Sequence, residues 1–382
     1  MHFSGRVSPT LRAALAMILV GLVPAVVLAR LGYLYWPVYL ALLTVSALFL
    51  LIAARAIWSI RGHPRLKNTL QGVWTSVVTL AILLFLLEAF FRLFVARTDG
   101  LAITLSHNNW MRRYWQPINS LGYRDDEWTP QSVAGKTKVL IVGDSFASGV
   151  GIEDYRQRMG NVLQAEVGSR YAVMLAAKPG WDSGPELQGL ESYPYPPDVL
   201  VLTYYINDID PVAAAHGLKV DNPVPAAHSP FWPLIGSSYL LNYVYFQGLR
   251  LPFLHASDTY LAYLEQAYQT PAIWQDHQAQ LTAFIDWSQA HHARLIAVIF
   301  PSLLKPEETA FATKKVAGTF SGPQVTVIDL TPSLIGEDPQ RNIVSAVDPH
   351  PSVSLHHRVA GDLCKAIAAM PGLPPVRCPP AP

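Results

Sequence analysis

Five short apolar runs, separated by helical patterns, constrain the fold of this chain more than any other feature. The runs end at turn residues, as buried parallel strands do, and they cover residues 139–142, 171–175, 199–202, 295–300 and 325–328. Apolar side chains recur at helical spacing over residues 156–167, 184–193, 274–290 and 352–369, with Ser352 at the cap position of the last. Strands that alternate with helices predict an α/β fold, a three-layer sandwich with a central parallel sheet.

The first apolar run ends in Gly143, Asp144 and Ser145. Doubly wound sheets bind ligands at the carboxyl ends of their strands, so a serine there is placed to act as a nucleophile. Such a serine needs a base, a group that orients the base, and donors for an oxyanion. The alternative is a turn serine without a chemical role.

The amino-terminal quarter differs from the rest in charge and hydropathy. Residues 1–99 carry a net charge of +7, whereas the remainder carries −6 and has no basic run, which gives no support for nucleic-acid binding. Uncharged stretches cover residues 13–29, 31–54 and 68–87, and about 20 apolar residues cross a bilayer. A cleaved signal peptide is the alternative for residues 13–29, but no small-x-small cleavage site there is followed by a polar segment that could begin the mature chain. We therefore expect three transmembrane helices.

Basic residues in the connections predict the orientation of these helices. Cations flank the first stretch and crowd residues 55–67, whereas the connection between the first two stretches holds only Arg30. The positive-inside rule then places the large carboxy-terminal domain outside the cytoplasmic membrane. Glu88 and Arg92, four residues apart, are expected to pair structurally near the outer interface.

The remaining organisation follows from composition and length. We expect a membrane domain over 1–98, a lead-in over 99–137, the α/β domain over 138–371 and a Pro-rich tail over 372–382. Residues 211–270 form an insertion too long for an ordinary connection, which is either a packed subdomain or a lid over the site. Cys364 and Cys378 either form a disulfide that pins the tail to the last helix or are unrelated thiols. We expect neither a cofactor nor a metal.

Four short sequence elements within residues 119–370 follow strand ends or precede the last helix, and they read Gly143-Asp144-Ser145, Lys178-Pro179-Gly180, Tyr205-Ile206-Asn207-Asp208 and Asp348-Pro349-His350. In this order they resemble the SGNH/GDSL hydrolase superfamily in its membrane-anchored bacterial form. The resemblance implies a flavodoxin-like fold and a serine nucleophile, Ser145, with His350 as base. It also implies an oxyanion hole made of the backbone N–H groups of Ser145 and Gly180 and the side chain of Asn207.

Several alternatives remain at individual positions. The family's usual spacing is Asp-x-x-His, whereas here Asp348 and His350 are two apart; on an extended segment both face the same way. Asp348 then orients His350. The alternative is a dyad of Ser145 and His350, in which a backbone carbonyl orients the imidazole. Instead of binding the oxyanion, Gly180 could only allow a tight turn, and Asn207 could only be a residue that favours a turn. His356 and His357 are rival bases, although they fall within a predicted helix.

The expected activity is that of a membrane-anchored, extracytoplasmic serine esterase that removes an acyl group, acetyl by preference, from an envelope or exported glycan. The substrate class rests on location and family analogy. Trp181, Tyr204 and Tyr205 are candidates for stacking on sugar rings. The alternatives are an O-acyltransferase that works with a membrane protein partner, a lysophospholipase, and an inactive envelope scaffold. The bilayer and an acylated ester substrate are the expected partners.

Overall fold

The computed structural model describes residues 36–219, 232–248 and 250–378, which divide into two units. The first contains residues 36–95, 104–106 and 232–248. The second contains residues 96–103, 107–219 and 250–378. The chain therefore passes from the second unit to the first between residues 219 and 232, and it is in the second unit again at Arg250.

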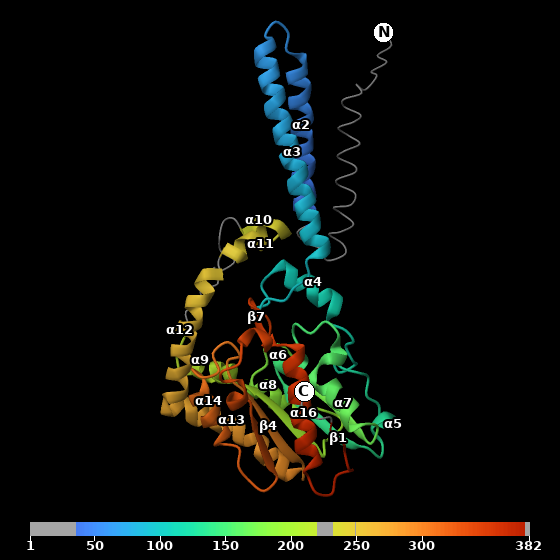
Figure 1. Cartoon of the computed structure of the whole chain (residues 1–382), viewed down its shortest axis with the longest axis vertical. Coiled ribbons are helices and arrows are strands. Elements are labelled where there is room, and N and C mark those ends of the chain that lie inside the picture. Colours follow the sequence, from blue (N-terminus) through green and yellow to red (C-terminus); the bar gives the residue numbers. More distant parts are fainter. Residues whose placement is uncertain (1–35, 220–231, 249, 379–382) are drawn as a thin grey trace, which may run out of the picture. The chain divides into compact units, whose positions relative to one another are not determined.

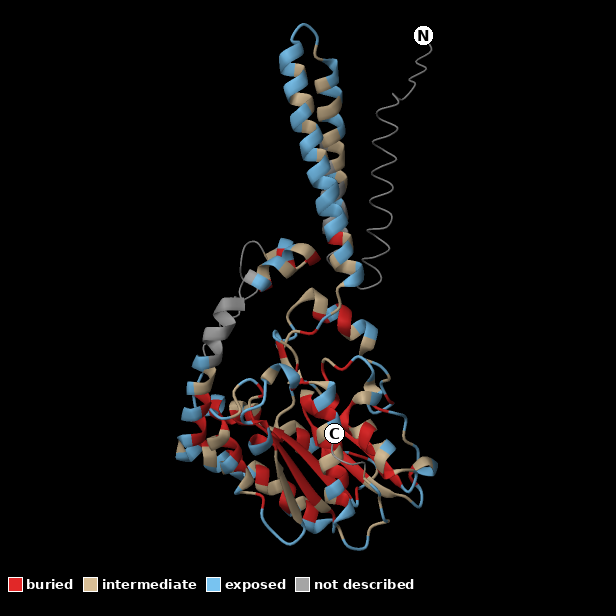
Figure 2. Cartoon of the chain, in the orientation of Figure 1, coloured by how far each residue is buried: buried red, intermediate tan, exposed pale blue. Residues whose placement is uncertain are grey.

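Two long helices form the main part of the first unit. Helix α2 (Trp36–Ser59) pairs with α3 (Pro64–Phe94), and the indole Nε1 of Trp74 donates to the carbonyl of Leu50 at 3.0 Å. Their outer faces are exposed and apolar (Figure 2). The same unit holds α10 (Trp232–Ile235) and α11 (Tyr239–Gly248).

The predicted membrane helices are supported in part. Within the described residues, α3 alone has the length and hydropathy to cross a membrane, and it contains the predicted stretch 68–87. The stretch 31–54 overlaps α2, and the stretch 13–29 lies outside the described residues. Three transmembrane helices therefore stay a prediction.

The second unit is built on a parallel sheet, which confirms the predicted α/β class. Its five strands lie in the order β2-β1-β3-β4-β5, the flavodoxin-like order. The strands are β1 (Thr137–Gly143), β2 (Tyr171–Ala177), β3 (Val199–Tyr205), β4 (Arg294–Phe300) and β5 (Val325–Asp329). The order reverses between β1 and β3, so ligands are expected where these two strands end.

Helices cover both faces of this sheet (Figure 1). Alternate residues of β1 explain why: Leu140 and Val142 pack toward one helical layer, and Val139 and Ile141 toward the other. The first layer contains α8 (Ser183–Glu191), α9 (Asp210–Ala215), α12 (Arg250–Gln269), α13 (Pro271–Ala290) and α14 (Ala310–Ala317). The second contains α6 (Ser145–Ser148), α7 (Met159–Val167), α15 (Thr331–Leu334) and α16 (Val353–Ala368).

Shorter elements complete the described chain. They are α4 (Leu105–Tyr114), α5 (Pro130–Val133), η1 (Tyr155–Gln157), η2 (Ile206–Ile209), η3 (Pro339–Arg341), and the antiparallel strands β6 (Ile343–Ser345) and β7 (Asp348–Pro351). The β6–β7 ribbon, α12 and α14 have no counterpart in the sequence-based expectation. Ser352 does cap α16, because its side chain accepts the Leu355 N–H at 3.2 Å.

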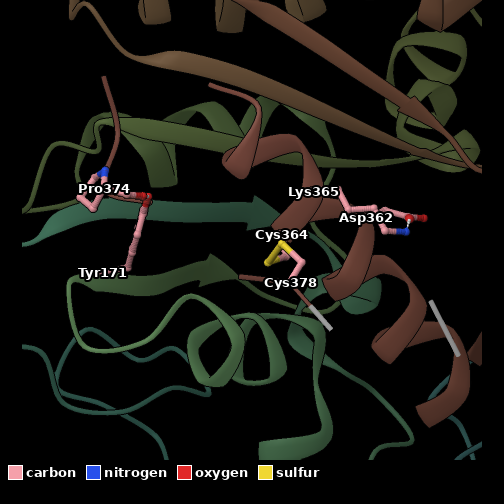
Figure 3. The surroundings of a disulfide bond; sticks show 6 residues. All are labelled: Tyr171, Asp362, Cys364, Lys365, Pro374 and Cys378. Carbon is pink, nitrogen blue, oxygen red and sulfur yellow. Dashed lines mark hydrogen bonds and ion pairs between the residues drawn. A yellow bond between two sulfur atoms is a disulfide. The ribbon is translucent and has the colours of Figure 1, made fainter. Parts of the chain in front are cut away.

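The tail is held against α16 and β2. Cys364 and Cys378 form a disulfide, and the Tyr171 hydroxyl donates to the carbonyl of Pro374 at 2.6 Å (Figure 3). Arg170 also donates to the carbonyl of Pro375, so the described part of the Pro-rich tail is tied to the second unit by the disulfide and by hydrogen bonds from two side chains.

Candidate active site

Ser145 lies at the turn between β1 and the short helix α6. The buried carboxylate of Asp144 caps this helix, since its Oδ1 accepts the Phe146 N–H at 2.7 Å. Position 143 requires a glycine because the neighbouring strand β3 approaches its Cα closely. A Cβ atom at this position would lie 1.8 Å from Thr203 Oγ1. The glycine thus lets β1 and β3 stay paired to their ends, and the serine is left partly exposed at the switch point.

His350 lies on β7, two residues after a fully buried aspartate. The Asp348 Oδ1 atom accepts from the His350 Nδ1 at 2.5 Å and from its backbone N–H at 3.2 Å. Burial opposes the ionisation of Asp348, but the hydrogen bonds and the positive charge of His350 outweigh it and hold the pKa of Asp348 below its usual value. The short Asp-x-His spacing therefore brings the two side chains into contact, because β7 is extended.

The two rival histidines have structural partners. The His356 Nδ1 atom accepts the Met159 N–H at 3.2 Å at the start of α7, and burial lowers the pKa of His356 to about 3. The His357 Nε2 atom lies 2.6 Å from Gln157 Oε1. Neither side chain is on β7 with Asp348, so His350 stays the candidate base.

Ser145 and His350 lie on α6 and β7, two elements in contact, without a hydrogen bond between the two side chains. The His350 ring packs edge-on against Phe146, the residue after the serine, with ring centroids 5.5 Å apart. The Ser145 hydroxyl donates to Asp144 Oδ2 at 3.3 Å, and within the described part of the chain no hydrogen bond joins it to His350.

The predicted oxyanion donors follow neighbouring strands. Gly180 lies in the turn after β2 with φ of 78°, and the Trp181 N–H closes this turn on the carbonyl of Lys178 at 3.2 Å. The tight-turn interpretation of Gly180 is thus compatible with the geometry as well. Asn207 lies in η2, directly after β3, and its side chain is partly exposed. Its amide makes no hydrogen bond to a described residue, and its Oδ1 atom is buried without a partner among the described residues.

A buried hydrogen-bond chain supports the Asn207 turn. The Tyr268 hydroxyl donates to the carbonyl of Ile206 at 3.0 Å, so it must accept from the Tyr204 hydroxyl, which it contacts. The Tyr204 hydroxyl also lies 2.8 Å from His277 Nε2, and burial lowers the pKa of His277 to about 4, so the imidazole is neutral. Sequence reasoning missed this chain because its members come from β3, α12 and α13.

Tyr204 corrects one sequence-based expectation. It was a candidate for contact with sugar rings, but its side chain is fully buried in the core beneath η2. Side chains alternate across a strand, so Tyr204 and Tyr205 cannot both face the same side of β3. Tyr205 stacks on Phe146 with ring centroids 4.1 Å apart, and Trp181 packs edge-on against Tyr123 at 5.9 Å. Both retain partial exposure near the strand ends.

Three buried carboxyl groups lie behind the site. Burial raises the pKa of Asp144 to about 6, although the Phe146 N–H and the charge of His350 lower it. Burial, reinforced by neighbouring carboxylates, raises the pKa of Glu186 and of Asp208 much further. Neither group has a hydrogen-bond partner among the described residues. Burial without a partner therefore favours the protonated form of Asp208.

The lead-in segment belongs to the scaffold of the site. The buried guanidinium of Arg124 donates to the carbonyls of Gly149 and Ile152, both at 2.7 Å, in the loop after α6. Asp125 pairs with the buried Arg158 at 3.2 Å and accepts the Leu175 N–H of edge strand β2. The irregular sequence of this segment thus conceals two buried charged residues that hold the loop behind the nucleophile.

Among the described residues, no three His, Cys, Asp or Glu side chains are arranged to hold a metal ion. Carboxyl, imidazole and hydroxyl groups are thus the reactive groups that the described site offers. Their arrangement suits acid–base and nucleophilic chemistry.

Comparisons with known proteins give remote likenesses. No protein-family model matches the chain, and no curated protein matches it in sequence. A solved structure of a carbohydrate esterase superimposes with a TM-score of 0.36 and 14% identity, over 62% of this chain and 69% of that one. A second solved structure gives a TM-score of 0.34 and 12% identity, over 62% of this chain and 99% of that one. Likenesses of this size say nothing about what the chain acts on.

Proposed function

We propose that this chain is a membrane-anchored serine esterase of the SGNH type. One observation carries the proposal: the imidazole of His350 is held by buried Asp348 and packs beside the residue that follows Ser145. A strand-end serine, an oriented histidine and an unengaged amide at Asn207 are the parts that acyl transfer needs. The four sequence elements that resemble the superfamily supply the same residues.

In the first half of the reaction, Ser145 Oγ attacks the carbonyl carbon of the ester. Its proton passes to His350 Nε2, while Asp348 holds the Nδ1 proton and stabilises the imidazolium. The backbone N–H groups of Ser145 and Gly180 and the amide of Asn207 donate to the oxyanion of the tetrahedral intermediate. The intermediate collapses, the C–O bond to the alcohol breaks, and the alcohol takes the proton from His350.

In the second half, water attacks the acyl-serine. His350 accepts a proton from the water, the oxyanion forms in the same place, and the serine leaves with that proton. The carboxylic acid is released. In an O-acyltransferase, a glycan hydroxyl takes the place of the water, and every other step is unchanged.

The proposed substrate is an acylated, by preference acetylated, glycan of the envelope or one in export. Support comes from the proposed location: α3 as a membrane anchor, with the second unit on the extracytoplasmic side. The Cys364–Cys378 disulfide fits an oxidising compartment. The aromatic side chains of Trp181 and Tyr205 are partly exposed and suited to contact with sugar rings.

A serine-directed fluorophosphonate probe tests the proposal on the full chain in detergent. We expect the wild type to be labelled and to hydrolyse p-nitrophenyl acetate, and Ser145→Ala to lose both activities. Ser148→Ala is the matched control, because Ser148 lies on the same helix but is fully buried. Equal labelling or turnover in Ser145→Ala contradicts the proposal.

A glycan acceptor added to the same assay separates hydrolysis from transfer. Release of acetate that exceeds acetylation of the acceptor favours the esterase. Faster acetylation of the acceptor favours the O-acyltransferase, with the same serine.

A further inference from the structure

Helices α10 and α11 form an uncharged, aromatic segment that the proposed reaction does not use. Residues 232–248 contain no Asp, Glu, Lys, Arg or His, and their aromatic residues are Trp232, Tyr239, Tyr243, Tyr245 and Phe246. Tyrosine and tryptophan concentrate where a membrane meets water. The segment belongs to the same unit as α3.

The start of α11 is fixed to the carboxyl-terminal part of α3 by Glu88. The buried Glu88 carboxylate accepts the backbone N–H groups of Tyr239 and Leu240, each at 2.9 Å, and the Ser238 hydroxyl at 2.8 Å. These are first-turn groups that α11 itself cannot satisfy, and a negative charge suits this end of a helix. An acidic residue of the membrane helix therefore serves as the cap of a second helix.

Arg92 and Phe91 extend this contact. Arg92 Nη2 donates to Glu88 Oε1 and to the carbonyl of Ser237, both at 3.1 Å, and its guanidinium lies 4.6 Å from the Tyr239 ring centroid. The rings of Phe91 and Tyr243 have centroids 4.7 Å apart. The predicted Glu88–Arg92 pair is thus present, and it holds α11.

The position of Glu88 in α3 sets the depth of this contact. The uncharged stretch 68–87 has 20 residues, which at about 1.5 Å each span the roughly 30 Å of a hydrocarbon core. Glu88 is the next residue, so the carboxylate and the start of α11 are expected where the hydrocarbon ends. This step rests on α3 crossing the bilayer.

One side of the segment presents apolar side chains. Leu241 and Val244, three residues apart on α11, are 45% and 58% exposed, and Leu234 of α10 is 45% exposed. Asn242 and Phe246 of α11 are buried on the other side. In the carboxyl-terminal part of α3, Phe90 and Phe94 are likewise 52% and 69% exposed.

We propose that α10 and α11 lie in the headgroup region of the phospholipid bilayer, with Leu234, Leu241 and Val244 against the acyl chains. An uncharged helix with aromatic residues, docked where a membrane span ends, fits this region. Three side chains are too few for a stable protein interface, which needs about 800 Å² from each partner. The second unit is then joined to the membrane both after α3 and through residues 232–248.

Depth-dependent fluorescence quenching on the reconstituted full chain tests this proposal. The chain has two cysteines, and they are paired with each other, so one introduced cysteine is the sole free thiol. Leu241→Cys and Val244→Cys are labelled with a polarity-sensitive fluorophore in phosphatidylcholine–phosphatidylglycerol vesicles. The quenchers are aqueous iodide and lipids that carry a spin label either near the glycerol backbone or near the chain end.

Two variants provide the references. Leu83→Cys lies on the exposed face of α3, within the stretch 68–87, and reports hydrocarbon depth; Ile335→Cys, 43% exposed in the second unit, reports a lone exposed apolar residue. We expect the α11 labels to be quenched several-fold more by the shallow than by the deep spin label, and to be protected from iodide relative to Ile335→Cys. Lipid quenching of Leu83→Cys, with a larger share from the deep spin label than for the α11 labels, supports the premise about α3.

Four results overturn the proposal. The first is that iodide quenches the α11 labels as strongly as the label of Ile335→Cys. The second is that the spin-labelled lipids place the α11 labels at the same depth as the label of Leu83→Cys. The third is that the α11 labels are quenched neither by iodide nor by either spin-labelled lipid, as expected for a contact with protein. Finally, Leu83→Cys is insensitive to lipid, which removes the premise about α3. None of these readouts uses enzymatic activity, so they are independent of the proposed reaction.

Discussion

At the scale of single residues, the contact between Asp348 and His350 matters most for the proposed chemistry. A histidine acts as a base through one ring nitrogen only if the other is held as an N–H donor. Asp348 is fully buried and reaches the Nδ1 atom at 2.5 Å, so it selects the tautomer that leaves Nε2 free. The two-residue spacing suffices because extended backbone puts residues i and i+2 on the same side.

Asp348→Asn is therefore expected to lower kcat for p-nitrophenyl acetate by about 10²–10⁴-fold, with KM changed little, because base catalysis is impaired and binding is not. Steady-state kinetics below the melting temperature measure this. Asp362→Asn is the control, since Asp362 lies on α16 and pairs with Lys365 at 2.9 Å. An Asp348→Asn enzyme with wild-type kcat would instead favour a Ser–His dyad.

Tyr204 shows what residue type alone leaves open. From its residue type alone, an aromatic residue near the end of a strand could equally well stack on a sugar ring or pack in the core. The deciding fact is the direction of the side chain, which the alternation along β3 sets. Tyr204 points into the core, where His277 and Tyr268 satisfy its hydroxyl.

At the scale of elements, α12 supports the η2 turn that carries Asn207. The link is the Tyr268 hydroxyl, which donates to the carbonyl of Ile206, the residue before Asn207. A shift of this carbonyl moves the amide that is proposed to bind the oxyanion. Misplacement by about 1 Å is enough to cost up to about 10²-fold in rate.

We expect Tyr268→Phe to lower kcat by about 10- to 10²-fold, and to lower the free energy of unfolding by about 1–3 kcal/mol, because the Ile206 carbonyl and the Tyr204 hydroxyl lose a partner. Tyr195→Phe is the matched control, since the Tyr195 hydroxyl donates to the carbonyl of Trp128 at 3.2 Å. Both variants are compared by kcat, KM and chemical denaturation. A purely structural role for Tyr268 predicts lower stability with an unchanged kcat.

At the scale of the whole molecule, the buried carboxyl groups couple folding to pH. Glu186 and Asp208 are almost completely buried, and burial raises the pKa of each above its unfolded value. The folded state then holds protons that the unfolded state has released. The free energy of unfolding must therefore fall as pH rises. The stabilisation that these two groups give the folded state is fully present below about pH 4, where the carboxyl groups of the unfolded chain are also protonated. It is lost as the pH rises toward their folded-state pKa values.

Asp208→Asn is expected to reduce this loss between pH 5 and pH 8, by about 1.4 kcal/mol for each unit by which folding raises the pKa. The amide imitates the protonated acid in shape and carries no charge. Denaturant unfolding of wild type and variant at several pH values measures the difference in slope. Asp286→Asn, on the exposed side of α13, controls for removal of a carboxylate as such. A wild-type slope in Asp208→Asn contradicts a protonated Asp208.

The sequence by itself determined the elements whose signals are local. The five strands lie where the apolar runs predict them, Ser352 caps the last helix, and Ser145 and His350 are identifiable from strand-end and helix-start motifs. These features depend on residues a few positions apart. Periodicity and capping are read over such distances.

Only the tertiary structure decided the arrangements between distant segments. The strand order, the chain of Tyr204, Tyr268 and His277, and the unpaired burial of Asp208 depend on residues far apart in the chain, 95 positions for Val199 and Arg294 in the β3–β4 pair. The capping of α11 by Glu88, across about 150 residues, is of the same kind. No local pattern encodes such contacts, because packing and the burial of charge depend on which surfaces meet after the chain folds.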